Sequence, residues 1–164
     1  MDVIRGKAIV LGDDVDTDQI LPGYAMAEPY DQLGKFAMAG LAGVDFQSVY
    51  EPGCILVAGR NFGCGSSREQ APIALRQAEI ALVMAKGFAR IFRRNSINIG
   101  LPVWVADVVD GVKTGDTLEV DLEKGTVTVN GETRQFQPMA ENVVKTLTYG
   151  GLIPRVRAEL GITE

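Results

Sequence analysis

Histidine is absent from this 164-residue sequence, and cysteine occurs only twice. Without histidine the chain cannot form a Ser-His-Asp triad, a Cys-His nucleophile pair, an HExxH zinc site or a histidine pH switch. Cys54 and Cys64 are too few for a disulfide framework, and too few to ligate an iron–sulfur cluster within this chain. Any proton transfer must therefore use another side chain, and we expect a reduced, intracellular protein.

Long apolar runs and an excess of basic charge are missing as well. The longest apolar run, residues 80–85, is far shorter than the roughly 20 residues that a membrane-spanning helix needs. Residues 1–11 lack the features of a secretory signal, so a cytoplasmic location is expected. With 16 basic and 21 acidic residues, the formal net charge of −5 disfavours nucleic acid as a partner. We therefore expect neither a membrane nor a nucleic-acid partner.

The order of apolar segments predicts an α/β fold in a single domain over residues 1–164. Between residues 54 and 106, buried strands alternate with helices, which implies parallel pairing through right-handed crossovers. After residue 110 apolar and polar residues alternate around a turn, which predicts an antiparallel hairpin. Residues 21–49, interrupted by glycine and proline, predict long loops with short helices. The expected strands are 7–11, 54–58, 80–85, 101–106, 118–122 and 127–129, and the expected helices are 71–78, 88–100, 139–149 and 155–161.

Glycine, by contrast, is plentiful, and a cluster of glycines follows the expected strand 54–58. Residues 59–72 read GRNFGCGSSREQAP. The glycines let the backbone turn sharply, and the following helix directs unpaired amides and a positive dipole end at the turn. This pattern predicts an anion site. It is neither a dinucleotide fingerprint nor a Walker loop, so nucleotide binding is not expected.

Ser66 is the candidate base in this segment. A serine surrounded by amide donors and guanidinium groups, such as that of Arg68, could be held as an alkoxide and act without histidine. Two alternatives stay open at this point. Ser66 and Glu69 also fit an S-x-x-E capping box, in which the serine only caps a helix. Cys64 is a competing nucleophile if electropositive surroundings lower the pKa of its thiol.

Four aspartates crowd into residues 13–18. Counted from Asp14, the segment has Gln19 where an EF-hand needs glycine and Ala25 where it needs glutamate, which excludes an EF-hand calcium loop. A solvated acidic loop is the simple alternative. Because like charges repel, we expect cationic groups close to these carboxylates.

Three ordered motifs resemble the swivel domain of the aconitase superfamily. They are VDTDQILP at residues 15–22, GCGSSREQAP at 63–72, and the segment 86–102, which begins KGFARIF. The resemblance runs from about residue 5 to the C-terminus. As a free chain of this length, the sequence is similar to the small-subunit family of 3-isopropylmalate dehydratases. The implied fold is a single swivelling β/β/α domain with a parallel sheet plus antiparallel strands.

This resemblance implies reversible dehydration of a hydroxy-dicarboxylic acid, here 2- and 3-isopropylmalate in leucine biosynthesis. It implies a large-subunit partner that carries a [4Fe-4S] cluster as Lewis acid, with no metal and no cofactor in this chain. Ser66 would be the catalytic base, while Ser67 and Arg68 would bind a substrate carboxylate. Thr17 and Asp18 would line the same cleft, and Asp18 would orient a cationic group.

By the same resemblance, substrate specificity lies in the loop after the Thr-Asp element. Its residues are Tyr24, Ala25, Met26 and Ala27. Members that take a third carboxylate usually carry Arg near position 26, and Met26 cannot bind a carboxylate bidentately, so an apolar substituent is expected. The alternatives are ordinary packing of Met26, a related hydro-lyase (homoaconitase, citramalate or dimethylmalate dehydratase), and a noncatalytic anion-binding module that docks a partner. Gln70 stands where many members carry histidine, so no proton relay is assigned to it.

Overall fold

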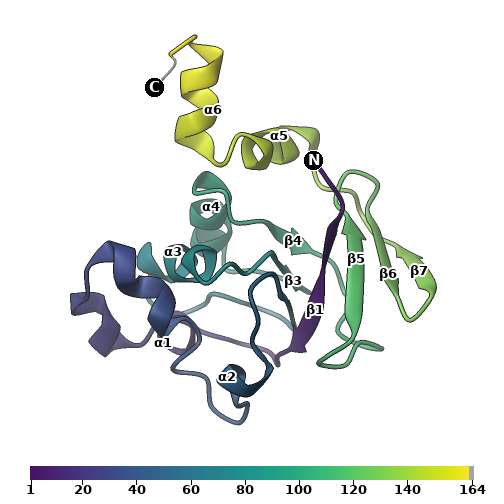
Figure 1. The fold of residues 1–164 in the computed structure, drawn as a ribbon, viewed down its shortest axis with the longest axis horizontal. Coiled ribbons are helices and arrows are strands. Elements are labelled where there is room, and N and C mark those ends of the chain that lie inside the picture. The colour runs from purple at the N-terminus through teal and green to yellow at the C-terminus, as the bar shows by residue number, and fades with distance from the viewer. Residues whose placement is uncertain (163–164) are drawn as a thin grey trace.

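A mixed sheet of seven strands organises the part of the chain that the computed structural model describes, residues 1–162 (Figure 1). The strands follow the order β4-β3-β2-β1-β5-β6-β7. Their bounds are β1 (Ile4–Val10), β2 (Ile55–Ala58), β3 (Leu82–Ala85), β4 (Val103–Val105), β5 (Thr117–Asp121), β6 (Thr126–Val129) and β7 (Glu132–Gln135). Strands β1 to β4 pair in parallel and β5 to β7 pair antiparallel, so the expected α/β class with both kinds of pairing is confirmed.

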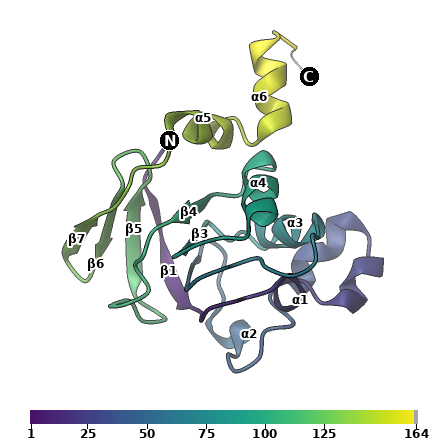
Figure 2. The ribbon, with the colours of Figure 1, turned by 180° about the vertical axis from the view of Figure 1, so that it is seen from behind.

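Strand β1 joins the two halves of the sheet because it pairs along both edges. Its residues 8–10 lie parallel to residues 55–57 of β2. Its residues 4–7 lie antiparallel to residues 117–120 of β5. Figure 2 shows the consequence from behind, with the hairpin strands on one side of β1 and the parallel strands on the other.

The two central strands β2 and β3 are buried along their whole length. Their sequences, ILVA and LVMA, carry no polar residue, as expected for parallel strands covered on both faces. The helices α3 (Gln70–Gln77) and α4 (Arg90–Asn98) follow β2 and β3 and lie together beside these strands (Figure 1). The start of each helix therefore comes after the carboxyl end of a parallel strand, where open α/β sheets place their sites.

Residues 17–49 form short helical turns, which the sequence predicts for its glycine- and proline-rich part, residues 21–49, but not for residues 17–20. They comprise α1 (Thr17–Ile20), the 3₁₀ turns η1 (Gly23–Ala27) and η2 (Tyr30–Phe36), and α2 (Phe46–Val49). The first turn begins inside the aspartate-rich segment. There the Asp16 carboxylate accepts a hydrogen bond from Gln19 N at 2.9 Å, and Gln19 Oε1 accepts one from Asp16 N at 2.9 Å. This D-x-x-Q capping box makes the segment a helix start rather than a free acidic loop.

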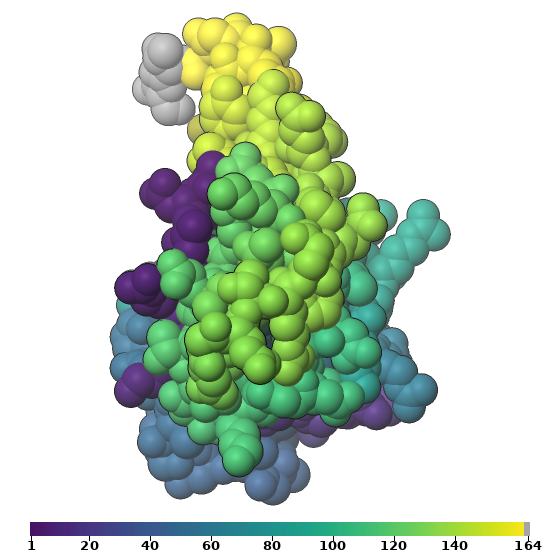
Figure 3. All heavy atoms as spheres, turned by 90° about the vertical axis from the view of Figure 1, so that its right-hand side faces the viewer, coloured from purple at the N-terminus to yellow at the C-terminus, as the bar shows by residue number. Residues whose placement is uncertain are grey.

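The last two helices, α5 (Glu141–Thr148) and α6 (Leu152–Glu159), differ in how they pack. Helix α5 buries Val144 and Leu147, whereas α6 buries no residue. Figure 3 shows the C-terminal segment, in yellow, extending from one end of the molecule. Within residues 1–162, no helix is long and apolar enough to cross a membrane. The single domain expected over 1–164 remains a prediction, and residues 163–164 lie outside the described part.

Candidate functional site

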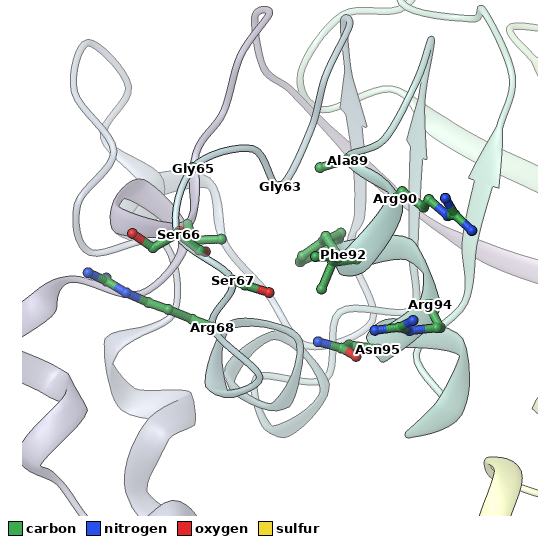
Figure 4. Close-up of a pocket in the computed structure, with 12 residues that line it drawn as sticks. Gly63, Gly65, Ser66, Ser67, Arg68, Ala89, Arg90, Phe92, Arg94 and Asn95 are labelled. Carbon is green, nitrogen blue, oxygen red and sulfur yellow. The ribbon is translucent and has the colours of Figure 1, made fainter.

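A cleft of about 530 Å³ opens between the glycine-rich turn and the start of α4 (Figure 4). The turn, residues 63–68, forms one wall, and Ala89 with the first part of α4 forms the other. The residues that line it are Thr17, Gly63, Gly65, Ser66, Ser67, Arg68, Ala89, Arg90, Ile91, Phe92, Arg94 and Asn95. The cleft thus contains the candidate base, Ser66, together with Ser67, Arg68 and Thr17 of the predicted site residues.

The segment before α1 holds the glycine-rich turn in place. Gly63 N donates a hydrogen bond to Val15 O at 2.7 Å, and Thr17 N donates one to Cys64 O at 2.9 Å. The Thr17 hydroxyl donates to Ser66 O at 2.8 Å. Thr17 is buried, so its main contribution to the cleft is to hold the backbone of Ser66 in place.

Close packing under the turn requires glycine at position 63. Gly63 has a φ of +84°, and a Cβ atom there would lie 2.3 Å from Cγ of Phe92. The Phe92 ring also meets those of Phe62 and Phe88, at centroid distances of 5.4 and 6.3 Å. These three rings form an apolar floor on which the backbone of the turn rests.

Ser66 and Ser67 are both exposed and both line the cleft. Helix α3 begins only at Gln70, with Glu69 as its N-cap and no side-chain capping bond. The capping-box interpretation of Ser66 is therefore wrong, because the helix begins too late for this serine to cap it. The Glu69 carboxylate instead accepts a hydrogen bond from the Tyr30 hydroxyl at 2.6 Å.

Arg68 is positioned by the segment that contains Asp18. The two side chains form an ion pair, and Arg68 Nη1 also donates a hydrogen bond to Leu21 O at 3.0 Å. The Arg68 side chain is 19% exposed. Figure 4 shows it extending away from α4, towards the outer side of the turn. Asp18 therefore orients a guanidinium group, although Asp18 itself does not line the cleft.

The predicted specificity residues lie on η1, which does not line the cleft in this chain. Tyr24 is 69% exposed and packs edge-on against Phe36 at 6.0 Å. Ala25 is buried, Met26 packs against the hydrophobic core, and Ala27 is exposed. The structure therefore separates these four residues from Ser66. Arg68 connects the glycine-rich turn to the segment just before η1, because it donates a hydrogen bond to Leu21 O.

The remaining aspartates contact the first residues of the glycine-rich segment. Asp13 accepts a hydrogen bond from Arg60 N at 2.8 Å and pairs with the Arg60 guanidinium at 3.5 Å. The backbone hydrogen bond, helped by the Arg60 charge, lowers the pKa of the Asp13 carboxyl. Asp14 accepts from Asn61 Nδ2 at 3.1 Å. The expected cationic neighbours are thus present for Asp13 and for Asp18.

Cys64 lies in surroundings opposite to those that a reactive thiol needs. Burial raises the pKa of its thiol, and the neighbouring carboxylates of Asp14 and Asp16 raise it further. The premise of an electropositive setting for Cys64 is therefore wrong. Cys54 is fully buried in the core. In the described residues, no three His, Cys, Asp or Glu side chains come together in a group that could hold a metal ion.

The wall formed by α4 is the part of the cleft that sequence reasoning did not assign. Arg90, Ile91, Arg94 and Asn95 all line it, whereas Arg93, on the same helix, is exposed and does not. The motif that begins at residue 86 could have indicated that this helix contributes to the site. The position of the helix next to the turn, however, depends on tertiary pairing, in which Ala89 N donates a hydrogen bond to Phe62 O at 2.9 Å.

Comparison with known families relates part of this chain to the aconitase class. The family model for the aconitase C-terminal domain matches residues 38–107. Among solved structures, the 3-isopropylmalate dehydratase of Methanocaldococcus jannaschii superposes with a TM-score of 0.89 at 40% sequence identity, covering 98% of this chain and 97% of that one. Aconitase X of Thermococcus kodakaraensis shares the fold with a TM-score of 0.50 at 20% identity.

Sequence relatives narrow the class to one family. The 3-isopropylmalate dehydratase small subunit 1 of Methanopyrus kandleri is 46% identical over 162 residues, covering 96% of this chain and 95% of that subunit. The small subunit 2 of Archaeoglobus fulgidus is 47% identical, covering 93% of each chain. The chain belongs to the family of 3-isopropylmalate dehydratase small subunits, as its motifs predict.

Proposed function

We propose that this chain is the small subunit of a hydro-lyase that interconverts 2-isopropylmalate and 3-isopropylmalate by dehydration and rehydration, a step of leucine biosynthesis. Identity of 46% along nearly the whole chain supports the activity. The observation that carries the proposal is that Ser66 is exposed on a glycine-rich turn, held in place by Thr17, and lines an open cleft.

In this reaction Ser66 removes a proton from the substrate carbon that bears hydrogen, and returns a proton during rehydration. Ser67 and Arg68 bind a substrate carboxylate, which places that carbon beside the Ser66 hydroxyl. Thr17 holds the backbone of Ser66 through the bond of 2.8 Å, and Asp18 holds Arg68 through its ion pair. Thr17 and Asp18 are therefore positioning residues, which fix the groups that touch substrate.

The Ser66 hydroxyl must lose its proton far more readily than an ordinary serine does. Backbone amides of the turn and the positive end of α4 favour an alkoxide electrostatically. In the free chain Ser66 is exposed, and water screens these interactions. A large subunit that closes over the cleft would exclude that water and strengthen the same interactions. On this physical ground, the proposal includes that the chain acts only together with a partner.

In this proposal a [4Fe-4S] cluster would belong to the large subunit and would supply the Lewis acidity that helps the substrate's hydroxyl group to leave. The described residues of this chain do not form a ligand set for such a cluster, since Cys54 is fully buried in the core. This chain's share of the chemistry is to hold the substrate and to transfer the proton at Ser66.

The preferred substrate carries an apolar substituent in place of a third carboxylate. Met26 lies outside the cleft of the free chain, and in this proposal it meets the substrate's substituent only in the assembled enzyme. It offers no charge to a carboxylate, and burial of an unpaired carboxylate would cost several kcal/mol in order of magnitude. A second substrate of the same kind is supported by the isopropylmalate/citramalate isomerase small subunit of Methanocaldococcus jannaschii, which is 43% identical over 162 residues. Citramalate carries a methyl group where isopropylmalate carries isopropyl, so one apolar pocket suits both.

The test is turnover of 3-isopropylmalate by the chain assembled with its large subunit. Ser66→Ala should lower kcat by at least ~100-fold, the usual scale for loss of a general base. Ser48→Ala, at an exposed serine that does not line the cleft, is the matched control and should leave kcat unchanged. Unimpaired turnover by an assembled Ser66→Ala enzyme would refute the assignment of the base.

A further inference from the structure

We propose that Arg94 and Asn95 form a second carboxylate site, which binds the end of the dicarboxylic substrate that Arg68 does not bind. This inference rests on the proposed function, because it concerns the substrate of that same cleft. It assigns a binding role to the wall formed by α4. The two carboxylates of one substrate would then lie at opposite walls.

The first argument is the arrangement of polar groups across the cleft. Ser67 and Arg68 lie on the glycine-rich turn, whereas Arg94 and Asn95 lie on α4. Figure 4 shows the Ser67 hydroxyl and the Asn95 side chain directed towards each other across the open space, with Arg94 beside Asn95 on the far wall. The Phe92 ring lines the same cleft and gives it an apolar surface. A short dicarboxylate, with carbon between two charged ends, fits this combination of polar and apolar surface.

The second argument is charge. Arg68 binds the first carboxylate in this proposal, but its Nη1 also pairs with the Asp18 carboxylate and with Leu21 O, so part of its charge is balanced within the chain. Within residues 1–162, Arg94 takes part in no ion pair and no side-chain hydrogen bond. A guanidinium group that lines a cleft without an internal partner is free to form two parallel hydrogen bonds with a ligand carboxylate.

The third argument is that the neighbouring arginines of α4 do not meet the same conditions. Arg93 is exposed and does not line the cleft. Arg90 lines it, but Figure 4 shows its guanidinium group directed away from the glycine-rich turn. Arg60, outside the cleft, is paired with Asp13. Arg94 is therefore the arginine best placed for the second carboxylate, and Arg93 provides a matched control on the same helix.

The experiment uses the holoenzyme, with this chain assembled on its large subunit. Arg94→Met keeps the aliphatic length and removes the charge, and Arg93→Met does the same outside the cleft. We expect kcat/KM for 3-isopropylmalate to fall about 10- to 100-fold in Arg94→Met, the scale of a lost charge-assisted hydrogen bond, and to stay unchanged in Arg93→Met. Arg94→Lys should recover part of the loss, because it restores the charge without the bidentate geometry.

The two monoamides of 3-isopropylmalate separate carboxylate binding from a structural role. Each has one neutral amide in place of a carboxylate, and each is measured as a competitive inhibitor. Arg94→Met should leave inhibition by one monoamide unchanged, because that compound lacks the carboxylate that Arg94 binds. It should weaken inhibition by the other monoamide about as much as it weakens binding of the dicarboxylate.

Three results would overturn this inference but not the proposed function. The first is equal kinetics of the Arg94→Met and Arg93→Met enzymes, and the second is equally weakened inhibition of the Arg94→Met enzyme by both monoamides. The third is weaker subunit association in Arg94→Met with an unchanged kcat/KM once the enzyme is assembled. The last result would make Arg94 a docking residue for the large subunit. Failure of the proposed function is seen separately, as absence of isopropylmalate turnover by the unaltered holoenzyme. That result would remove both conclusions.

Discussion

Single residues decide whether the cleft exists at all. Gly63 leaves room for the Phe92 ring, and Thr17 fixes the carbonyl of Ser66. The predicted cluster of Ser66, Ser67 and Arg68 was readable from the sequence because the three are adjacent on one turn. The capping alternative could be rejected only with the start of α3 in view, since S-x-x-E fits either a cap or a loop.

Replacing Gly63 by alanine tests the packing under the turn. The new Cβ would lie 2.3 Å from Phe92 Cγ at a φ of +84°, so we expect a loss of roughly 2–4 kcal/mol in the free energy of unfolding. Gly115→Ala is the control, because Gly115 has a φ of +98° but no atom within 4 Å of the new Cβ. It should lose only about 1–2 kcal/mol. Urea unfolding measures both, and equal losses would contradict the clash.

The Cys64 thiol should be unreactive in the native chain. Its pKa is raised above the ordinary value of 9.0 by burial and by Asp14 and Asp16, so less thiolate is present at pH 8 than in the unfolded chain. The raised pKa stabilises the fold below about pH 9, and this contribution is lost as pH rises further. Iodoacetamide labelling, read by mass spectrometry of the Cys64 peptide, should be slower before denaturation than after it. Faster labelling of the native chain would show an activated thiol.

Elements with a strong apolar signal were predicted well, and the polar ones were not. The buried runs of β2 and β3 and the alternating residues of β5 and β6 lie where the sequence places them. Strand β7 reads ETRQ and is held by backbone pairing with β6. It has no alternation of apolar and polar residues, so the sequence does not predict it. The four aspartates indicate a loop, so the sequence does not predict helix α1, although the D-x-x-Q pattern of a capping box is present.

The two C-terminal helices should contribute very differently to stability. Leu147 of α5 is 6% exposed, so Leu147→Ala should lower the free energy of unfolding by about 2–5 kcal/mol. Ile153 of α6 is 65% exposed, and Ile153→Ala should change it by no more than about 0.5 kcal/mol. Urea unfolding of the two variants provides the comparison. A large loss in Ile153→Ala would show that α6 packs more closely than its exposure indicates.

At the scale of the whole molecule, the sequence predicted the class of fold and one wall of the site. The turn wall is local, and a single motif defines it. The opposite wall comes from α4, more than twenty residues later, and reaches the turn only because β2 and β3 are neighbours in the sheet. The position of residues such as Arg94 therefore depends on the order of strands in the sheet, which cannot be read from one sequence.

The central place of β1 in the sheet has a consequence for how the polypeptide is made. This strand leaves the ribosome before either of its partners, because one edge pairs with β2 at residue 55 and the other with β5 at residue 117. Both waiting partners are distant in sequence, so these pairings close large loops, which slows folding. Until about residue 121 has been synthesised, β1 exposes an unpaired edge, and nascent chains are most vulnerable to aggregation in that interval.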